Sequence, residues 1–236
     1  MQCGRDSGRT ATIKERTMEL KYKCLVLDHD DTVMDSTRHV HWPAFLGAMD
    51  QMRPGVRLTY EEYLHVNFDP GFTPYCRDVL HFTEEDFDRE VEIWQSYVDR
   101  CVPKVFPAVA EIIREHKKRG GYLCVSSHSL SKNILRDYRA NGLPEPDLIF
   151  GWDLAPELRK PAPYCLETIM QTLRLAPGEL LMVDDLKPGY LMAQSCGVDF
   201  AAAGWAYDIP EIEDFMRQNC DRYYKTAEAL YAFLFG

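Results

Sequence analysis

The feature that most constrains this chain is a short stretch in which four apolar residues, Cys24–Leu27, run directly into the carboxylates Asp28, Asp30 and Asp31. An apolar run without polar alternation is typical of a strand that is buried on both faces, as in the centre of a parallel sheet. The carboxylates would then follow the carboxyl end of that strand, where open α/β sheets bind their ligands. The alternative is an acidic turn without function, because Asp is common in turns.

The crowding of these carboxylates favours a cation site. Two carboxylates about 4 Å apart repel each other by roughly 4 kcal/mol at an effective dielectric constant of about 20. Asp28, Asp30 and Asp31 therefore need a compensating cation. Mg²⁺ fits, because it takes oxygen ligands and commonly shares its coordination between one or two carboxylates and a phosphorylated substrate. The stretch thus predicts a Mg²⁺-dependent phosphoryl-transfer site.

Charge and cysteine usage exclude several other classes. The formal net charge is −10 and the isoelectric point is near 5.2, which argues against a binder of nucleic acid or anionic membranes, since these carry basic patches. The longest stretch without charged side chains, Gly120 to Ser131, is much shorter than the roughly 20 residues of a transmembrane helix. The eight cysteines show no metal-ligand spacing, so we expect a cytoplasmic protein. Its expected partner is a small phosphorylated metabolite, and the chain is expected to be a monomer or a small homo-oligomer.

Further apolar runs predict the elements that follow the first strand. Strands are expected at Tyr122–Val125, Leu180–Val183 and Val198–Ala203, and helices at Val109–Lys118, Ser131–Ala140, Tyr164–Leu173 and from Thr226 onward. Strands that alternate with helices predict an α/β fold with a doubly wound parallel sheet. Between residues 36 and 104 the apolar residues instead recur at helical spacing. We therefore expect an N-terminal tail (1–18), an α/β core domain (19–35 and 105–236) and an inserted α-helical domain (36–104).

Polar side chains follow three of these strands and precede one helix. The residues in question are Asp28, Asp30, Ser126, Ser127, Lys160, Asp184 and Asp185. Taken singly, each has a simpler explanation: a helix N-cap for a serine, an acidic turn for an aspartate pair, a solvated loop cation for the lysine. Because parallel strands share one polarity, their carboxyl ends meet at one edge of the sheet. Together, these residues therefore favour a single site.

In this order the motifs resemble those of the haloacid dehalogenase (HAD) superfamily, and specifically its phosphoglycolate phosphatase and beta-phosphoglucomutase-like branch, which carries a helical cap. Leu25–Thr32 is similar to motif I, Ser126 to motif II, Lys160–Pro163 to motif III, and Met182–Asp185 to motif IV in its double-aspartate form. The resemblance covers about residues 22–235. The helical insert stands where the family has its cap.

The resemblance implies a role for each matching residue. Asp28 would be the nucleophile that forms an aspartyl-phosphate, and Asp30 the general acid and then base. Ser126, or Ser127 if the match slips by one, would donate to a phosphoryl oxygen, and Lys160 would balance the charge of nucleophile and phosphate.

The same resemblance implies a Mg²⁺ site and exposes one departure from the family pattern. Mg²⁺ would be held by Asp28, by the main-chain carbonyl of Asp30, and by either Asp184 or Asp185. Asp31, counted here with the phosphate-binding positions, stands where the family usually has Gly. A carboxylate there should weaken anion binding unless it points away.

The helical insert leaves the exact reaction open. Arg38 and His41 are its first candidates for substrate recognition, with His39 and Arg77 as further ones, and His41–Phe45 is similar to the stretch where the mutase branch carries a substrate-sensing His. A lone His is nevertheless more often packed or solvated. We predict a Mg²⁺-dependent phosphomonoester hydrolase; a sugar-phosphate mutase and a catalytically silent binding protein are the alternatives. A dehalogenase is less expected, because that branch needs neither the second aspartate nor Mg²⁺.

Overall fold

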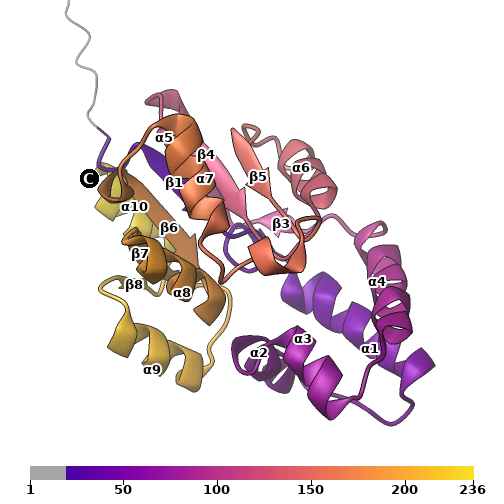
Figure 1. The fold of residues 1–236 in the computed structure, drawn as a ribbon. Coiled ribbons are helices and arrows are strands. Elements are labelled where there is room, and N and C mark those ends of the chain that lie inside the picture. Colours follow the sequence, from indigo (N-terminus) through magenta and orange to yellow (C-terminus); the bar gives the residue numbers. More distant parts are fainter. Residues whose placement is uncertain (1–19) are drawn as a thin grey trace, which may run out of the picture.

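The computed structural model describes residues 20–236, so the tail predicted at residues 1–18 lies outside the described residues. Figure 1 shows two bodies: a sheet with helices around it, and a group of helices, coloured indigo to magenta, formed by residues 37–98. The chain therefore leaves the sheet after its first strand and returns to it later.

A six-stranded parallel sheet forms the first body, in the order β5-β4-β1-β6-β7-β8. Its strands are β1 (Cys24–Leu27), β4 (Tyr122–Ser126), β5 (Leu148–Phe150), β6 (Leu180–Asp184), β7 (Asp199–Ala203) and β8 (Tyr223–Tyr224). β1 lies between β4 and β6, and all its residues are buried. Leu27 is opposite Val125 of β4 and Val183 of β6, so the three strands end together at one edge.

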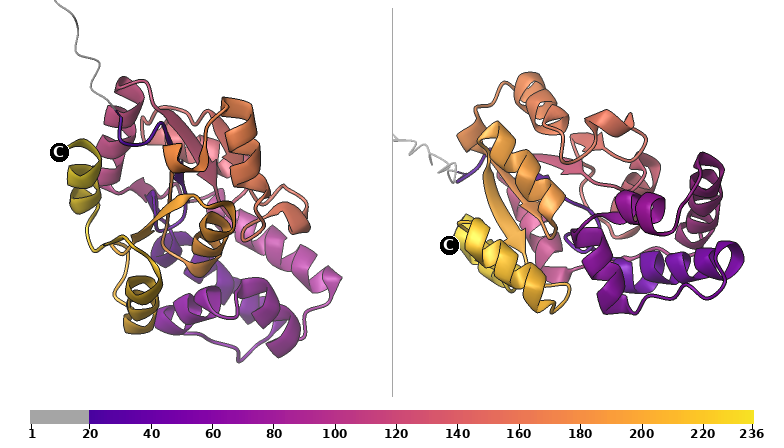
Figure 2. Two further views of the ribbon diagram at one scale, coloured as in Figure 1. Left: turned by 60° about the vertical axis from the view of Figure 1, so that its left-hand side comes forward. Right: turned by 60° about the horizontal axis from the view of Figure 1, so that its bottom comes forward.

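Helices cover both faces of this sheet, as Figure 2 shows. One face carries α5 (Pro107–Lys118), α6 (Ser131–Ala140) and α10 (Ala227–Phe235); the other carries α7 (Tyr164–Leu173), α8 (Lys187–Cys196) and α9 (Pro210–Asn219). Alternate residues of β1 point to opposite faces. Leu25 and Leu27 pack with the first group, and Cys24 and Val26 with the second. The doubly wound parallel sheet predicted from the sequence is thereby confirmed.

The second body is helical. It contains η1 (Thr37–His41), α1 (Trp42–Met52), α2 (Tyr60–Phe68), α3 (Phe72–Pro74), η2 (Tyr75–Val79) and α4 (Glu84–Val98). Its own apolar core joins α1, α2, η2 and α4 around Phe45, Tyr63, Cys76 and Ile93. The chain enters and leaves it through two short antiparallel strands, β2 (Met34–Asp35) and β3 (Lys104–Val105), which the sequence did not predict.

Side chains from both bodies meet on either side of the sheet edge. On one side the rings of Phe68 (α2) and Phe215 (α9) lie 5.2 Å apart. On the other side Arg136 of α6 donates to the Val98 carbonyl at the end of α4, at 2.8 Å. The helical body is thus fixed beside the carboxyl ends of the strands. Among residues 20–236, no helix is long and apolar enough to cross a membrane.

Candidate active site

Three carboxylates meet where β1 and β6 end. Asp28 follows β1, Asp184 is the last residue of β6, and Asp185 comes next. All three are buried, and one oxygen of each lies within 4.8 Å of the others. Like charges this close need a cation. All-oxygen donors of this kind suit Mg²⁺, so this part of the chain fits the ion that the sequence predicted.

Lys160 lies between two of these carboxylates. It belongs to the loop before α7, and its Nζ donates to Asp28 Oδ1 at 2.7 Å and to Asp184 Oδ2 at 2.5 Å. Burial alone would lower the pKa of Lys160, but the charges of Asp184 and Asp28 raise it above its ordinary value. Burial raises the pKa of Asp28 to about 7, against the opposing effect of Lys160. One ammonium therefore compensates part of the charge of this cluster.

Asp184 and Asp185 have different partners. Asp184 accepts, besides Lys160, the backbone N–H of Leu186 at 2.9 Å. Asp185 Oδ1 accepts the hydroxyl of Thr32 at 3.3 Å, and its Oδ2 accepts the hydroxyl of Tyr207 at 2.8 Å. Asp185 is thus held by neutral hydroxyls only, and burial together with the charges of Asp184 and Asp28 raises its pKa well above its ordinary value. Tyr207 had no local sequence signal, because it approaches Asp185 only in the folded chain.

A glycine makes room for Asp184. A Cβ atom on Gly189 of α8 would lie 2.2 Å from Asp184 Oδ2 and 2.6 Å from Asp184 Cβ. Real Cβ atoms do not come this close to other atoms. The Asp184 carboxylate therefore reaches Lys160 only because residue 189 has no side chain.

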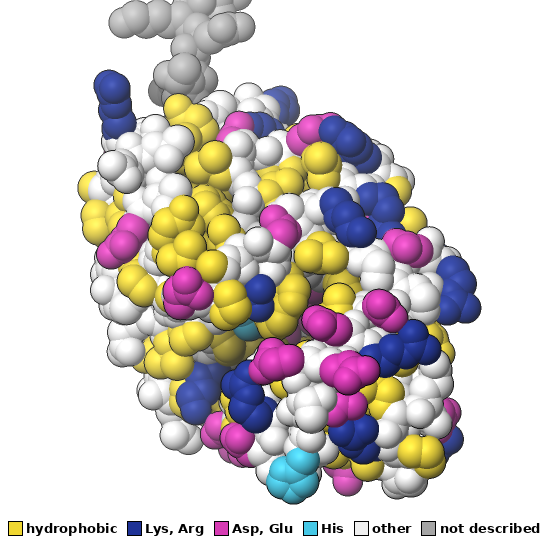
Figure 3. Space-filling model, turned by 45° about the vertical axis from the view of Figure 1, so that its right-hand side comes forward, with side chains coloured by type: hydrophobic (Ala, Val, Ile, Leu, Met, Phe, Trp, Pro, Cys, Tyr) yellow, Lys and Arg dark blue, Asp and Glu magenta, His cyan; other side chains and the backbone are white. Residues whose placement is uncertain are grey.

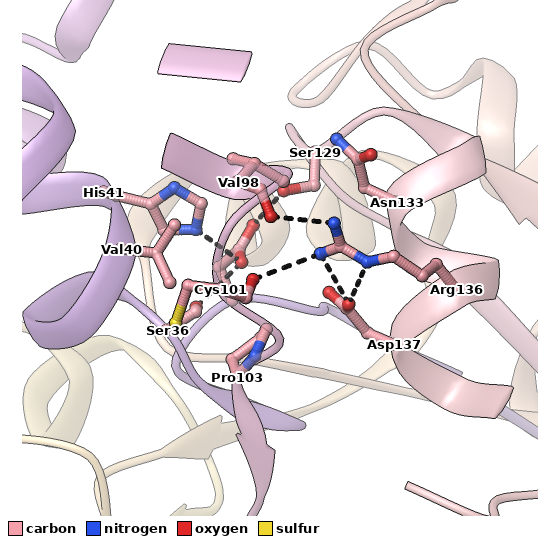
Figure 4. A pocket seen from close by; sticks show the side chains of 11 residues that line it. Ser36, Val40, His41, Val98, Cys101, Pro103, Ser129, Asn133, Arg136 and Asp137 are labelled. Atoms are coloured by element: carbon pink, nitrogen blue, oxygen red, sulfur yellow. Dashed lines mark hydrogen bonds and ion pairs between the residues drawn. The ribbon is translucent and has the colours of Figure 1, made fainter. Parts of the chain in front are cut away.

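Asp30 is held by a separate set of donors. Its Oδ1 accepts the hydroxyl of Ser36 at 2.8 Å and Nε2–H of His41 at 2.7 Å, and its Oδ2 accepts the hydroxyl of Ser129 at 2.6 Å. Figure 4 shows these three side chains converging from the helical body and from the loop after β4. Burial would raise the pKa of Asp30, but His41 and the hydroxyl donors hold it below its ordinary range. Asp30 is therefore held as an anion.

His41 owes its orientation to Trp94 of α4. The indole Nε1–H of Trp94 donates to His41 Nδ1 at 2.9 Å, and the two rings stack. An indole N–H can only donate, so Nδ1 carries the lone pair and the ring proton of the neutral imidazole sits on Nε2. That proton is the one donated to Asp30. Sequence reasoning placed His41 near the substrate but missed Trp94, which lies far away along the chain.

Two serines of the loop that follows β4 lie close to the Asp30 carboxylate. Ser126 is buried at the end of β4. Ser127 Oγ lies 3.5 Å from Asp30 Oδ2 and accepts the backbone N–H of Ser129 at 3.1 Å. Ser129 was not predicted, although it belongs to the same polar run after the strand. Of the two predicted serines, the structure thus brings Ser127 next to Asp30.

Asp31 turns its side chain toward the helical body. Its φ is +58°, in the left-handed region that favours glycine. Its Oδ1 accepts the backbone N–H groups of Thr37 at 3.0 Å and Ser36 at 3.3 Å, at the start of η1. Burial raises the pKa of Asp31 to about 6. The carboxylate therefore accepts hydrogen bonds from the backbone amides at the start of η1. This gives a physical reason for a charged residue at this position.

The remaining candidates of the helical body are engaged with its own residues. Arg38 lies over the ring of Tyr60 at 4.3 Å, His39 is 3.4 Å from Asp35, and Arg77 packs on a ring 5.6 Å away. Within residues 20–236, no hydrogen bond joins these side chains to the acidic cluster.

Comparison with known proteins agrees with this geometry. The model of the haloacid dehalogenase-like hydrolase family matches residues 25–203. A phosphoglycolate phosphatase of Vibrio vulnificus is 30% identical over 203 residues, covering 80% of this chain and 86% of that protein.

Solved structures share the fold at lower identity. A putative haloacid dehalogenase-like hydrolase from Bacteroides fragilis superposes with a TM-score of 0.75 at 21% identity, covering 89% of this chain and 100% of that one. CbbY from Rhodobacter sphaeroides, in complex with phosphate, gives 0.71 at 20% identity, with 89% and 96% covered.

Proposed function

Because this chain belongs to the haloacid dehalogenase-like hydrolase family and is a phosphatase of that family, we propose that it is a Mg²⁺-dependent phosphomonoester hydrolase that forms an aspartyl-phosphate. Its substrate is a small phosphorylated metabolite. The observation that carries the proposal is the convergence of Asp28, Asp184 and Asp185 around Lys160, next to Asp30. The helical body, as the cap of this enzyme, covers the leaving group.

Asp28 and Asp30 divide the chemistry between them. A carboxylate oxygen of Asp28 attacks phosphorus, and the bond from phosphorus to the ester oxygen breaks as that oxygen takes a proton from Asp30. Water then attacks the same phosphorus, Asp30 accepts its proton, and the bond to Asp28 breaks to release inorganic phosphate. The donors around Asp30 suit the second step, because they hold it as an anion that can accept a proton from water. The proton given to the ester oxygen in the first step is the one taken from water in the preceding turnover, and Asp30 must give up part of these bonds to keep it.

Asp28 and Asp185 are our assignment for the Mg²⁺ ligands, together with the carbonyl of Asp30. Asp184 is already compensated by Lys160, whereas Asp185 has only hydroxyl partners. When bound, the ion would supply the positive charge that the carboxylates and the phosphoryl oxygens need. Lys160 and Ser126 would complete the phosphate site, as preorganised donors.

Hydrolysis of a generic aryl phosphate tests this function. The native protein is assayed with Mg²⁺ and with EDTA, beside Asp28→Asn, which keeps the shape of the side chain but removes the nucleophile. We expect Mg²⁺-dependent release of phosphate and a loss of at least about 10³-fold in the variant, as for the removal of other catalytic nucleophiles. Activity of Asp28→Asn within tenfold of the native enzyme would contradict the assignment, provided that circular dichroism shows the same fold.

The mutase and the silent scaffold are not favoured. The relative with 30% identity is named as a phosphatase, and a silent scaffold would be expected to lose Asp28, Asp30 or Lys160, all of which are present. A mutase would need a bisphosphate primer to isomerise a sugar phosphate. Isomerisation that depends on such a primer, without net release of phosphate, would show that the protein is a mutase.

A further inference from the structure

A carboxylate without a partner lies in the middle of the buried face of α4. Glu90 is 6% exposed, although the exposed face of the same helix already holds most of its acidic residues. Within residues 20–236, its side chain makes no hydrogen bond or ion pair. A buried carboxylate normally has such a partner, because its burial costs free energy otherwise. Among residues 20–236 the fully enclosed polar side-chain atoms without a partner are His29 Nδ1, Asp31 Oδ2 and Tyr138 OH, so the oxygens of Glu90 keep a small access to solvent through which a ligand can reach them.

Glu90 lies on the side of α4 that faces the general acid. It precedes Trp94 by one helical turn, so the two side chains leave the helix on the same face. Trp94 is bonded to His41, and His41 to Asp30. α4 also packs against α1 and against η1, the element that carries His41. The carboxylate thus belongs to the group of side chains around Asp30, on the side of the helical body.

That group is where a leaving group must lie. Asp30 protonates the ester oxygen in the proposed reaction, so the atoms beyond that oxygen extend from Asp30 toward the helical body. Among the side chains there, Trp94 donates its N–H to His41, and His41 donates its N–H to Asp30. Glu90 offers acceptor atoms and needs a donor.

We propose that Glu90 contacts the leaving group and selects phosphate monoesters that carry an ammonium or hydroxyl group over those that carry a carboxylate. The inference rests on the proposed function and names its substrate class. A donor on the leaving group gives Glu90 the partner that the protein does not supply. A carboxylate in the same place puts two like charges together in a poorly solvated site, which opposes binding.

The charge of the helical body acts in the same direction. Residues 37–98 contain eleven Asp and Glu against five Lys and Arg. In Figure 3 acidic side chains gather near the middle of the face shown, with Lys and Arg side chains around them. The excess of negative charge in the helical body favours the approach of cationic groups over anionic ones. The Vibrio vulnificus relative is named a phosphoglycolate phosphatase, and the glycolate that leaves phosphoglycolate carries a carboxylate; we infer a different preference for this chain.

Three esters of similar size separate these alternatives: 2-aminoethyl phosphate, 2-hydroxyethyl phosphate and phosphoglycolate. For each, kcat/KM is measured at pH 8, where Glu90 is ionised, with the native enzyme, with Glu90→Gln and with Glu92→Gln. The last variant is the matched control, because Glu92 is an exposed Glu of the same helix. Inhibition constants against an aryl phosphate are measured as well, so that the comparison does not require turnover of each ester.

We expect the native enzyme to favour the aminoethyl and hydroxyethyl esters over phosphoglycolate by about tenfold or more, and Glu90→Gln to reduce this ratio by about tenfold, mainly through KM. Glu92→Gln should leave the ratio unchanged. A native preference for phosphoglycolate, or the same ratio in Glu90→Gln, overturns the inference. If Glu90→Gln does not fold, Glu90→Met, which keeps the length of the side chain, takes its place.

The aryl phosphate separates this inference from the function on which it rests. Asp28-dependent hydrolysis of the aryl phosphate together with an unchanged ester ratio overturns only the role of Glu90. Absence of that hydrolysis in the native enzyme overturns the proposed function and the inference with it.

Discussion

Lys160 is the residue on which the electrostatic balance of the acidic cluster depends. It is buried and donates to Asp28 and Asp184 at once. Lys160→Met would leave both carboxylates buried without a cation, and removal of one partner of a buried ion pair costs about 3–5 kcal/mol. We therefore expect the free energy of unfolding in EDTA to fall by about this amount, and Mg²⁺ to restore part of it.

Urea denaturation with EDTA and with Mg²⁺ measures both effects of Lys160→Met. Lys225→Met is the matched control, because Lys225 also pairs with two carboxylates, those of Asp208 and Glu213, but at a largely exposed position. Exposed pairs contribute less than about 1 kcal/mol. Equal losses in the two variants would contradict the role assigned to Lys160.

The sequence allowed the charged residues of the site to be predicted, but not their neutral partners. Asp28 and Asp184 could be found because they follow apolar strands, and parallel strands bring such positions together. Trp94 and Tyr207 had no such signal, since each reaches its partner from a helix or loop whose position depends on tertiary packing. The side-chain direction of Asp31 was equally out of reach, because it depends on a positive φ and on the amides of η1.

At the scale of elements, α8 approaches β6 so closely that it needs a glycine. Gly189→Ala would place Cβ 2.2 Å from Asp184 Oδ2. In the interior of a solvent-exposed helix, a change from Gly to Ala would stabilise the protein by about 1 kcal/mol. Here Asp184 must move away from Lys160 and from the Leu186 N–H, so we expect lower stability and a loss of about tenfold or more in kcat, comparable to a displaced catalytic group.

Gly178→Ala is the control for this substitution. Gly178 lies in the turn before β6, and a Cβ there meets no atom within 4 Å. Thermal unfolding and aryl phosphate hydrolysis should be unchanged in this variant. A Gly189→Ala protein that is as stable and active as the control would show that Asp184 does not depend on the missing side chain.

The buried face of α4 predicts a dependence of stability on pH. Burial raises the pKa of Glu90 from 4.5 to about 7, with His41 opposing. The folded state thus holds the proton more tightly than the unfolded state, so this contribution to stability is present below pH 4.5 and is lost as the pH rises through 7. Glu90→Gln should therefore be more stable than the native protein at pH 8, by at most about 3 kcal/mol, and equal to it near pH 4.5.

Urea denaturation of the native protein and of Glu90→Gln between pH 4.5 and 8 measures the difference in their free energies of unfolding. The titration of all other groups cancels in this difference, because both proteins contain them. A difference in the free energy of unfolding that does not change with pH would contradict the unpaired burial of Glu90.

Long elements were predictable from the sequence and short ones were not. The helices predicted at Ser131–Ala140 and Tyr164–Leu173 have those bounds in the structure, because their apolar positions repeat over several turns. The helix predicted from Val109 begins at Pro107, where proline is tolerated in the first turn. β2 and β3 have two residues each, too few for any periodicity, and exist only because they pair with each other.

At the scale of the whole molecule, the order of the chain indicated that a helical segment interrupts the sheet, but not how the two bodies touch. The ring contact of Phe68 with Phe215 and the 2.8 Å contact of His65 Nδ1 with the Glu211 carboxylate join residues more than a hundred positions apart. No local pattern links such partners. Their contacts hold α2 near α9 and so bring the helical body over the strand ends.

The binding of Mg²⁺ connects the site to the stability of the whole chain. An ion that binds only the folded state stabilises it by about 2.7 kcal/mol at a concentration of 100 times Kd. For a chain of this size, this corresponds to a rise in Tm of roughly 5–10 °C. Because the net charge is −10, any salt also reduces the repulsion within the molecule. The comparison must therefore separate specific binding from screening.

Thermal unfolding is followed in EDTA, in millimolar Mg²⁺ and in NaCl of the same ionic strength, for the native protein and for Asp185→Asn. Screening acts on all charges and is the same for both salts at equal ionic strength, whereas coordination needs Asp185 as well as Asp28. We expect Mg²⁺ to raise Tm beyond the effect of NaCl in the native protein only. If Mg²⁺ and NaCl act alike, the acidic cluster does not bind the ion; if Asp185→Asn responds like the native protein, Asp184 is the ligand and the assignment of the two neighbours must be exchanged.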